Sequence, residues 1–239
     1  MQTVINNPQN NLKYYIPPKW IIILLIITIT IIALFVLIAK LSKPSNSNSP
    51  NNIINNLPIN NPTRLLAEKR DRPSFGNPDA KLVIVEFSDF QCSVCQAEFP
   101  IIRAIANKYQ DQILYIYRQY PIINDGSPLV SQASLCANEQ NKFWPLHDRL
   151  FLNAKSDFTK DDLITIAQQS GLNKNQFSNC LSSEKYQDII NEDFQDGYAL
   201  QVPGTPTFFI NGNKLSGEVS TDNWELIIDQ SLKLINSQK

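Results

Sequence analysis

The sequence predicts an α/β domain with the order βαβ, a block of helices, then ββα, preceded by one long apolar helix. Three observations support this prediction. A strand-like run at 82–87 passes through a Cys-x-x-Cys pair into a helical pattern, helical periodicity fills 128–200, and strand signals return at 207–210. The chain has 239 residues and a formal net charge of −1. This length favours one ordinary domain and an additional segment.

The additional segment is apolar from residue 20 to residue 39 except for two threonines. About 20 helical residues span the roughly 30 Å hydrocarbon core of a bilayer. We therefore predict a transmembrane anchor over 20–41 and a cytoplasmic tail over 1–19, with membrane lipid as the partner of the anchor. A cleaved signal peptide is the alternative, but its apolar core is usually shorter and the site after the run is a poor cleavage site.

Lysines flank the apolar run at 20–39 on both sides, with Lys13 and Lys19 before it and Lys40 and Lys43 after it. Charge therefore does not orient the anchor. The chain has four cysteines, which suit an oxidising compartment better than the cytosol. We expect the N-terminus inside the cytoplasmic membrane and the catalytic domain on the exported side, be it periplasmic, extracellular or lumenal.

Residues 42–63 are dominated by Ser, Asn and Pro. This composition buries too little apolar surface to offset chain entropy, so we predict a flexible linker there. The folded domain is expected over 64–239, although 72–78 still has the pattern of turns. The sequence contains no internal repeat and no glycine-rich phosphate loop.

The first half of the domain has the pattern of one βαβ unit. A strand is predicted at 82–87, followed by a helix to about residue 109 whose apolar residues are spaced three and four apart. Pro100 is expected to kink this helix near its start. A second strand is predicted at 112–117, where both faces are largely apolar.

A helical insertion is predicted at about 125–201. Its helices are expected at 129–138, 142–152, 159–169, 173–181 and 183–200. Thr159 and Asp162 resemble a capping box with Asp in place of Glu.

The second half of the domain has the pattern of a ββα unit. A strand is predicted at 207–210, the turn pair Asn211-Gly212 follows, and a short partner strand is expected at 214–216. The last helix is predicted from about residue 221 to 235.

Cys92 and Cys95 lie where a strand passes into a helix. Unpaired N–H groups and the positive end of the helix dipole favour a thiolate there. We expect Cys92 to be exposed and to be the nucleophile that forms mixed disulfides, and Cys95 to be the buried resolving thiol of higher pKa. A zinc site would need two further ligands, and the chain offers only the distant Cys136, Cys180 and His147.

Three stretches resemble the DsbA-like thiol:disulfide oxidoreductases of the thioredoxin superfamily. They are VEFSDFQCSVC at 85–95, KFWPLHDRLF at 142–151 and VPGTPTFFING at 202–212. The resemblance covers roughly 75–235 and implies a thioredoxin fold with a helical insertion between its βαβ and ββα halves. It also implies that the chain acts on unfolded or reduced exported proteins and is recharged by a quinone-linked membrane thiol oxidase.

The resemblance also assigns roles around the cysteine pair. Pro206 is expected in cis, so that the Thr205 carbonyl can pair with the backbone of an extended substrate; a trans turn proline is the alternative. Ser93 and Val94 are expected to contact substrate and to tune the pair. The strongest oxidants of the family have a histidine where this chain has Val94, so the Cys92 thiolate should depend on backbone N–H groups and the helix dipole.

Glu86 matches a family position where a partly buried acid lies beneath the cysteines and can take or return the proton of the inner thiol. A solvated carboxylate at a strand end is the alternative, and Asp89 has the same two interpretations. For His147, the sole histidine, packing in a helix is favoured over a general-base role.

Cys136 and Cys180 both lie in the helical insertion. A structural disulfide between them is favoured, which the chain-entropy model values at about 4 kcal/mol. Two free buried thiols or a second redox relay are the alternatives.

Together these observations predict a membrane-tethered thiol:disulfide oxidoreductase that introduces disulfides into exported proteins. No metal, flavin or nucleotide cofactor and no nucleic-acid partner is implied. An isomerase or a reductase using the same site is the alternative within enzymes. A non-catalytic peptide-binding chaperone or metal carrier is the alternative of another class.

Overall fold

The computed structural model describes residues 4–6, 13–15, 17–41 and 61–237. The chain divides into two compact units, Met1–Asn46 and Ser47–Lys239. The predicted tail at 1–19 and the predicted linker at 42–63 fall mostly on residues outside those described.

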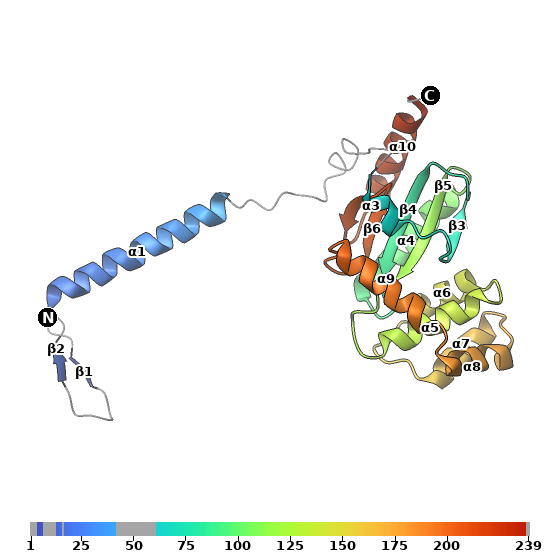
Figure 1. Ribbon diagram of the computed structural model, residues 1–239, viewed down its shortest axis with the longest axis horizontal. Helices are drawn as coiled ribbons and strands as arrows, with labels where there is room; N and C mark the ends of the chain where they lie inside the picture. The colour runs from blue at the N-terminus through green and yellow to red at the C-terminus, as the bar shows by residue number, and fades with distance from the viewer. Residues whose placement is uncertain (1–3, 7–12, 16, 42–60, 238–239) are drawn as a thin grey trace. The chain divides into compact units, whose positions relative to one another are not determined.

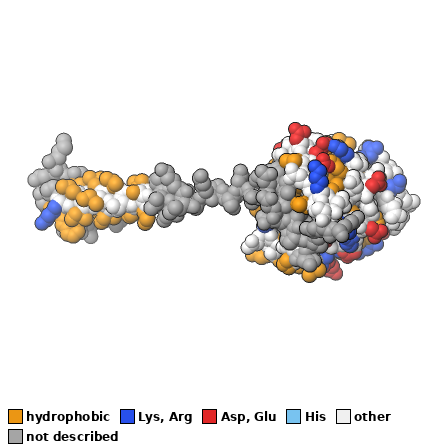
Figure 2. All heavy atoms as spheres, turned by 90° about the horizontal axis from the view of Figure 1, so that it is seen from above, with side chains coloured by type: hydrophobic (Ala, Val, Ile, Leu, Met, Phe, Trp, Pro, Cys, Tyr) orange, Lys and Arg blue, Asp and Glu red, His pale blue; other side chains and the backbone are white. Residues whose placement is uncertain are grey.

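The first unit contains a short antiparallel strand pair and a long helix. Strand β1 (Val4–Asn6) pairs with β2 (Lys13–Tyr15), and α1 covers Pro18–Leu41. The side chains described in α1 are mainly large and apolar (Figure 2). Within the part of the chain whose side chains are described, which in α1 ends at residue 35, no helix reaches the length and hydropathy of a membrane span. The transmembrane anchor at 20–41 is therefore not confirmed and stays a prediction.

The second unit is built on one mixed sheet with the strand order β3-β5-β4-β6-β7 (Figure 1). The strands are β3 (Ser74–Gly76), β4 (Leu82–Ser88), β5 (Ile113–Gln119), β6 (Thr207–Ile210) and β7 (Asn213–Ser216). Only β4 and β5 run parallel, and all other neighbours are antiparallel. The central strand β4 is buried along its whole length, as its almost entirely apolar sequence requires.

Helices cover both faces of this sheet because successive residues of β4 point to opposite sides. Ile84 packs in a cluster with residues of α4 (Ser93–Lys108) and α10 (Thr221–Ser237). Val85 packs on the other face, against a cluster that includes side chains of α9 (Gln187–Ala199). The end of β4 and the start of α4 therefore lie at an edge of the core.

The helical insertion packs beside this edge. Its helices are α5 (Ser127–Asn138), α6 (Phe143–Leu152), α7 (Lys160–Gln169), α8 (Lys174–Ser183) and α9. Side chains of α5, α6, α7 and α8 share one apolar cluster with Cys92 and Cys95. The insertion thus forms one wall of the cysteine site. The thioredoxin-like fold with a helical insertion is confirmed.

Two short elements differ from the prediction. Helix α3 covers Thr63–Ala67, and β3 forms where turns were expected at 72–78. Strand β3 pairs with the edge of β5, and a strand of this length forms only because that partner is present. Pro100 lies inside α4 without ending the helix.

A buried group of charges connects the start of this unit to its sheet. Asp193 on α9 accepts hydrogen bonds from Arg72 Nε at 2.8 Å, from Arg118 Nε at 2.7 Å and from the Gln119 N–H at 2.8 Å. Arg118, Arg72 and Asp193 are all at most 4% exposed. Each charge is therefore paired within the protein rather than with water.

Candidate functional site

Cys92 is the N-cap of α4, and Cys95 lies in the first turn of this helix. Both are free thiols. The Cys95 N–H donates to Cys92 Sγ at 3.3 Å, so the first sulfur uses one of the helix N–H groups that have no partner in the helix. Cys92 is 5% exposed and Cys95 is fully buried. The prediction that Cys92 is exposed is therefore wrong in degree, because the loop that contains Thr205 lies against its sulfur.

The two thiols have opposite acidities. A hydrogen bond from the Cys95 thiol, aided by backbone N–H groups, lowers the pKa of Cys92 to about 6, although burial opposes this shift. Burial raises the pKa of Cys95 well above its ordinary value, and the hydrogen bond to Cys92 and the charge of Glu86 act in the same direction. At neutral pH the pair therefore consists of an outer thiolate and an inner thiol.

The Thr205–Pro206 peptide bond is cis. The Cys92 Sγ lies 3.2 Å from the Thr205 carbonyl oxygen, so the peptide group that precedes β6 contacts the outer sulfur. The Pro206 carbonyl accepts a hydrogen bond from the Gly217 N–H at 2.9 Å, and the Thr207 hydroxyl donates to the Gly204 carbonyl at 2.7 Å. These bonds hold the loop in place beside the pair.

Glu86 lies on β4 beneath the pair and is 3% exposed. The alternative of a solvated carboxylate at a strand end is therefore wrong. Burial raises the pKa of Glu86 to about 7, although a hydrogen bond from the Tyr115 hydroxyl opposes the shift. A carboxyl group that titrates near neutral pH close to a thiol is able to accept and return a proton there.

Four further polar side chains near this site were missed by sequence reasoning: Ser88, Glu98, Tyr115 and Tyr117. All four are fully buried. For the three on strands, Ser88, Tyr115 and Tyr117, a signal was present in the sequence, since side chains at alternate positions of a strand face the same side of a sheet. Tyrosines in an apolar run were instead assigned to the core.

Glu98 lies on α4, three residues after Cys95. Its carboxyl accepts hydrogen bonds from Trp224 Nε1 at 2.7 Å and from the Val219 N–H at 2.9 Å. Burial raises the pKa of Glu98 to about 7. Because both oxygens have partners next to the start of α10, this residue joins the cysteine helix to α10.

Asp89 is also buried, but its carboxyl binds backbone groups. It accepts from the N–H groups of Gln91, Ile122 and Ile123, each at 2.9 Å. Asp89 therefore fixes the loop after β5 beside the loop that leads to Cys92. Its place favours a structural role over proton transfer to Cys95.

Exposed apolar side chains border the pair. Val94, between the cysteines, is 40% exposed, and Ile122 and Ile123 on the loop held by Asp89 are 40% and 45% exposed. Ser93 is exposed as well. This border offers contact surface to an apolar stretch of polypeptide.

His147 on α6 is buried among aromatic rings. Its ring centroid lies 5.1 Å from that of Tyr117 and 5.6 Å from that of Phe90. Its Nδ1 lies 2.8 Å from an Asp148 carboxylate oxygen, and burial lowers its pKa. These contacts agree with the packing role favoured by the sequence.

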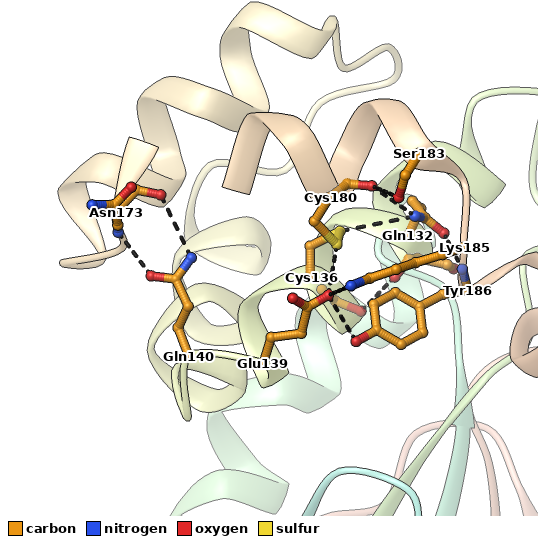
Figure 3. The surroundings of a disulfide bond; sticks show 11 residues. Gln132, Cys136, Glu139, Gln140, Asn173, Cys180, Ser183, Lys185 and Tyr186 are labelled. Atoms are coloured by element: carbon orange, nitrogen blue, oxygen red, sulfur yellow. Dashed lines mark hydrogen bonds and ion pairs between the residues drawn. A yellow bond between two sulfur atoms is a disulfide. The ribbon is translucent and has the colours of Figure 1, made fainter. Parts of the chain in front are cut away.

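Cys136 on α5 and Cys180 on α8 form a disulfide with a Cα–Cα distance of 5.8 Å. The alternative of two free thiols is therefore wrong. Figure 3 shows the Glu139 carboxylate beside this bond, with one oxygen 2.9 Å from the Cys180 sulfur. The same oxygen is 2.7 Å from Lys185 Nζ and accepts a hydrogen bond from the Tyr186 hydroxyl at 2.8 Å. The described residues include one cluster of potential metal ligands, which is formed by Cys136, Glu139 and Cys180. Its two sulfurs are already joined to each other in the disulfide.

Comparisons with known proteins agree with this geometry. A family model described as Thioredoxin matches residues 68–230. The chain is 29% identical over 144 residues to Na(+)/H(+) antiporter NhaA 3 of Salinispora tropica, covering 59% of this chain and 22% of the relative. The chain thus spans less than a quarter of the length of such antiporter relatives.

A second relative is similar over most of its length. Probable disulfide bond formation protein D of Bacillus cereus is 28% identical over 171 residues, which cover 67% of this chain and 78% of the relative. Among solved structures, the thiol-disulfide exchange protein alpha-DsbA2 of Wolbachia pipientis matches with a TM-score of 0.66 at 20% identity, covering 80% of this chain and 100% of that chain. This last likeness concerns the fold alone.

Proposed function

Because the chain belongs to the thioredoxin family, we propose that it is a thiol:disulfide oxidoreductase whose exchange centre is the Cys92–Cys95 pair. One observation supports this proposal above all. An outer thiol whose pKa is lowered to about 6 lies 3.2 Å from the carbonyl of a cis X-Pro peptide, directly above an inner thiol of raised pKa. This arrangement provides a nucleophile, a resolving thiol and a peptide-binding backbone group in one place.

The proposed reaction starts from the oxidised pair. A substrate thiolate attacks Cys92, a mixed disulfide forms, and Cys95 leaves and takes a proton for which Glu86 is the source. A second substrate thiolate then attacks the substrate sulfur of the mixed disulfide, and Cys92 leaves as a thiolate. The substrate loses two electrons and the enzyme pair gains them.

We infer that the chain runs in the direction of disulfide formation. A low pKa of Cys92 stabilises the reduced pair, which makes the oxidised pair the stronger oxidant. The name of the Bacillus cereus relative also describes disulfide formation. An isomerase or a reductase would use the same site.

The proposed function includes a location in the cell, a substrate class and a partner protein. The N-terminal helix would anchor it in the lipid of the cytoplasmic membrane, with the domain on the exported side. Reduced or unfolded exported proteins would be its substrates, held by backbone pairing at Thr205 and by contacts with Ser93 and Val94. A quinone-linked membrane thiol oxidase would return the pair to its disulfide form.

The decisive test is the Cys92→Ser variant. It should lose all oxidation of reduced ribonuclease and all reduction of insulin, because no mixed disulfide can form. The double variant Cys136→Ala, Cys180→Ala is the matched control and should retain both activities. A non-catalytic chaperone or metal carrier would be indicated if the wild-type protein bound peptide without exchanging thiols, or if Cys92→Ser were as active as wild type.

The direction is tested by equilibrium titration of the pair against glutathione. A potential of about −120 mV is typical of a strong oxidase and one of about −270 mV is typical of a reductase. We expect a value nearer the first, and a value at the second would overturn the oxidase direction.

A further inference from the structure

Four buried polar side chains lie on one face of the two parallel strands beneath the cysteine pair. Glu86 and Ser88 belong to β4, and Tyr115 and Tyr117 belong to β5. The register places Glu86 opposite Tyr117. None of the four is more than 3% exposed. Alternate residues of a strand share a face, so all four lie on the side of the sheet that α4 covers.

Tyr115 holds the carboxyl group of Glu86. Its hydroxyl donates to Glu86 Oε2. Its ring stacks on Trp144 with centroids 5.4 Å apart, and Trp144 Nε1 donates to the Ser74 carbonyl at 2.8 Å. The position of the carboxyl is therefore set by a ring that is itself fixed, and Tyr115 is a positioning residue.

The hydroxyls of Tyr117 and Ser88 are buried, and neither makes a hydrogen bond of good geometry to a described residue. The Ser88 hydroxyl nevertheless lies close enough to Glu86 and to Tyr117 to interact with both. The Tyr117 ring stacks on Phe90 at 5.3 Å and contacts the edges of neighbouring rings, so rotation of the O–H bond is its main freedom. A buried hydroxyl without a partner is unfavourable. Phenylalanine or alanine would fill these positions without that cost, so the two hydroxyls call for a role in another state of the site.

We propose that Tyr117 and Ser88 form a hydroxyl relay that carries the proton between the Cys95 thiol and the Glu86 carboxyl during disulfide exchange. This inference rests on the proposed function but is independent of its direction. A proton must reach Cys95 when it leaves and must be removed when it attacks. The two cysteines are free thiols in this structure, so the inner thiol still holds its proton and there is no Cys95 thiolate for the hydroxyls to bind.

The proton balance of the relay is simple. When Cys95 leaves as a thiolate, one hydroxyl gives its proton to the sulfur and receives a proton that comes from the Glu86 carboxyl. One S–H bond forms, the carboxyl O–H bond breaks, and both hydroxyls end as they began. Burial raises the pKa of Tyr117 well above its ordinary value, so the phenol passes a proton and does not become an anion.

The other titratable or charged groups that face this cluster have partners of their own. Glu98 on α4 is bonded to the start of α10, and Asp89 is bonded to backbone N–H groups. His147 and Arg103 both contact Asp148. Glu86 is therefore the carboxyl best placed to exchange protons with Cys95. Cys92, the remaining group, is the reacting thiol itself.

The test compares Tyr117→Phe and Ser88→Ala with wild type and with Tyr120→Phe. Tyr120 packs on the opposite face of the sheet, so its variant is a matched loss of one hydroxyl. Single-turnover reduction of the oxidised pair by glutathione is followed from pH 5 to 9, with rates corrected for the glutathione thiolate, in H₂O and D₂O.

Loss of the relay should slow the reaction about 10- to 100-fold near pH 7 and should remove both the inflection due to Glu86 and the solvent isotope effect. The midpoint of thermal unfolding should not fall in Tyr117→Phe, because the variant loses only a hydroxyl that makes no hydrogen bond of good geometry. Tyr120→Phe should leave the rate and the pH profile unchanged.

Two results would overturn the relay. One is a Tyr117→Phe variant with the wild-type pH profile and isotope effect. The other is a variant that is slower only in proportion to a lower unfolding midpoint, which would indicate a packing role. Failure of the proposed function would give a different result. Wild type itself would then neither be reduced at the Cys92–Cys95 pair by glutathione nor exchange disulfides with a protein substrate.

Discussion

Glu86 has an acidity that is set by its surroundings rather than by its chemical type. Burial disfavours its charged form, the Tyr115 hydroxyl favours it, and the net effect is a pKa of about 7. The same residue on the surface would be charged throughout the range in which thiols exchange. Cys92 shows the opposite balance, because hydrogen bonds to its sulfur outweigh burial.

This acidity predicts a dependence of stability on pH at the residue scale. The pKa of Glu86 rises from 4.5 to about 7 in the folded protein, so its contribution to stability is complete below pH 4.5 and is lost as pH rises through 7. Glu86→Gln does not titrate. Wild type should therefore lose about 3 kcal/mol relative to this variant between pH 4 and pH 8, as measured by urea unfolding of the reduced proteins.

Glu184→Gln is the control for this prediction, because Glu184 is exposed. Its unfolding curve should follow that of wild type at every pH. If the free energy of unfolding changed with pH in the same way for Glu86→Gln and for wild type, the Glu86 carboxyl would not have the raised pKa given above.

The disulfide between α5 and α8 acts at the scale of elements, since it joins two helices of the insertion across 44 residues of chain. Removing it in the double variant Cys136→Ala, Cys180→Ala should lower the free energy of unfolding by about 2–4 kcal/mol, because the unfolded chain regains its freedom. Guanidinium unfolding measures this loss. A variant as stable as wild type would contradict the assignment of a stabilising role to this bond.

The elements that the sequence predicted well are those whose signals are local. Helix α7 has its capping box at Thr159 and Asp162 as expected, and β4 follows from a continuous apolar run. Strand β3 was missed because three residues between Pro73 and Asn77 have no periodicity of their own, and their strand geometry depends on β5. Pro100 lies inside α4, which continues through it, and the kink expected there stays a prediction.

The candidate site shows the same limit, that only local signals can be recognised in one sequence. The cysteine pair, the Thr205–Pro206 dipeptide and Glu86 were located from motifs. The alignment of Glu86 with Tyr117 was not, because it depends on how β4 and β5 are paired, and one sequence does not contain the register.

At the scale of the whole molecule, Asp193 connects parts of the chain that are far apart. From α9, a helix of the insertion, it joins Arg72, before the sheet, to Arg118 near the end of β5. A charged residue in a helical pattern is ordinarily assigned to the surface, so nothing in the sequence indicates that these residues pair. Their pairing is a product of the complete fold.

Asp193→Asn should therefore be among the most destabilising single changes in the protein. It leaves two buried guanidinium groups without their shared carboxylate, which typically costs about 3–5 kcal/mol. Urea unfolding measures the loss, and Asp188→Asn on the exposed side of the same helix is the control, with a change below about 0.5 kcal/mol. If the two variants were equally stable, the buried charges would not hold the fold together.

The Glu139 carboxylate beside the Cys180 sulfur has a consequence for chemical selectivity within one polypeptide. An incoming thiolate is an anion, and near Cys180 it meets the Glu139 carboxylate, one oxygen of which lies 2.9 Å from the Cys180 sulfur. At Cys92 it meets backbone N–H groups instead. Under the proposed function, the Cys92–Cys95 pair would exchange disulfides with other proteins while the Cys136–Cys180 bond is protected from the same exchange.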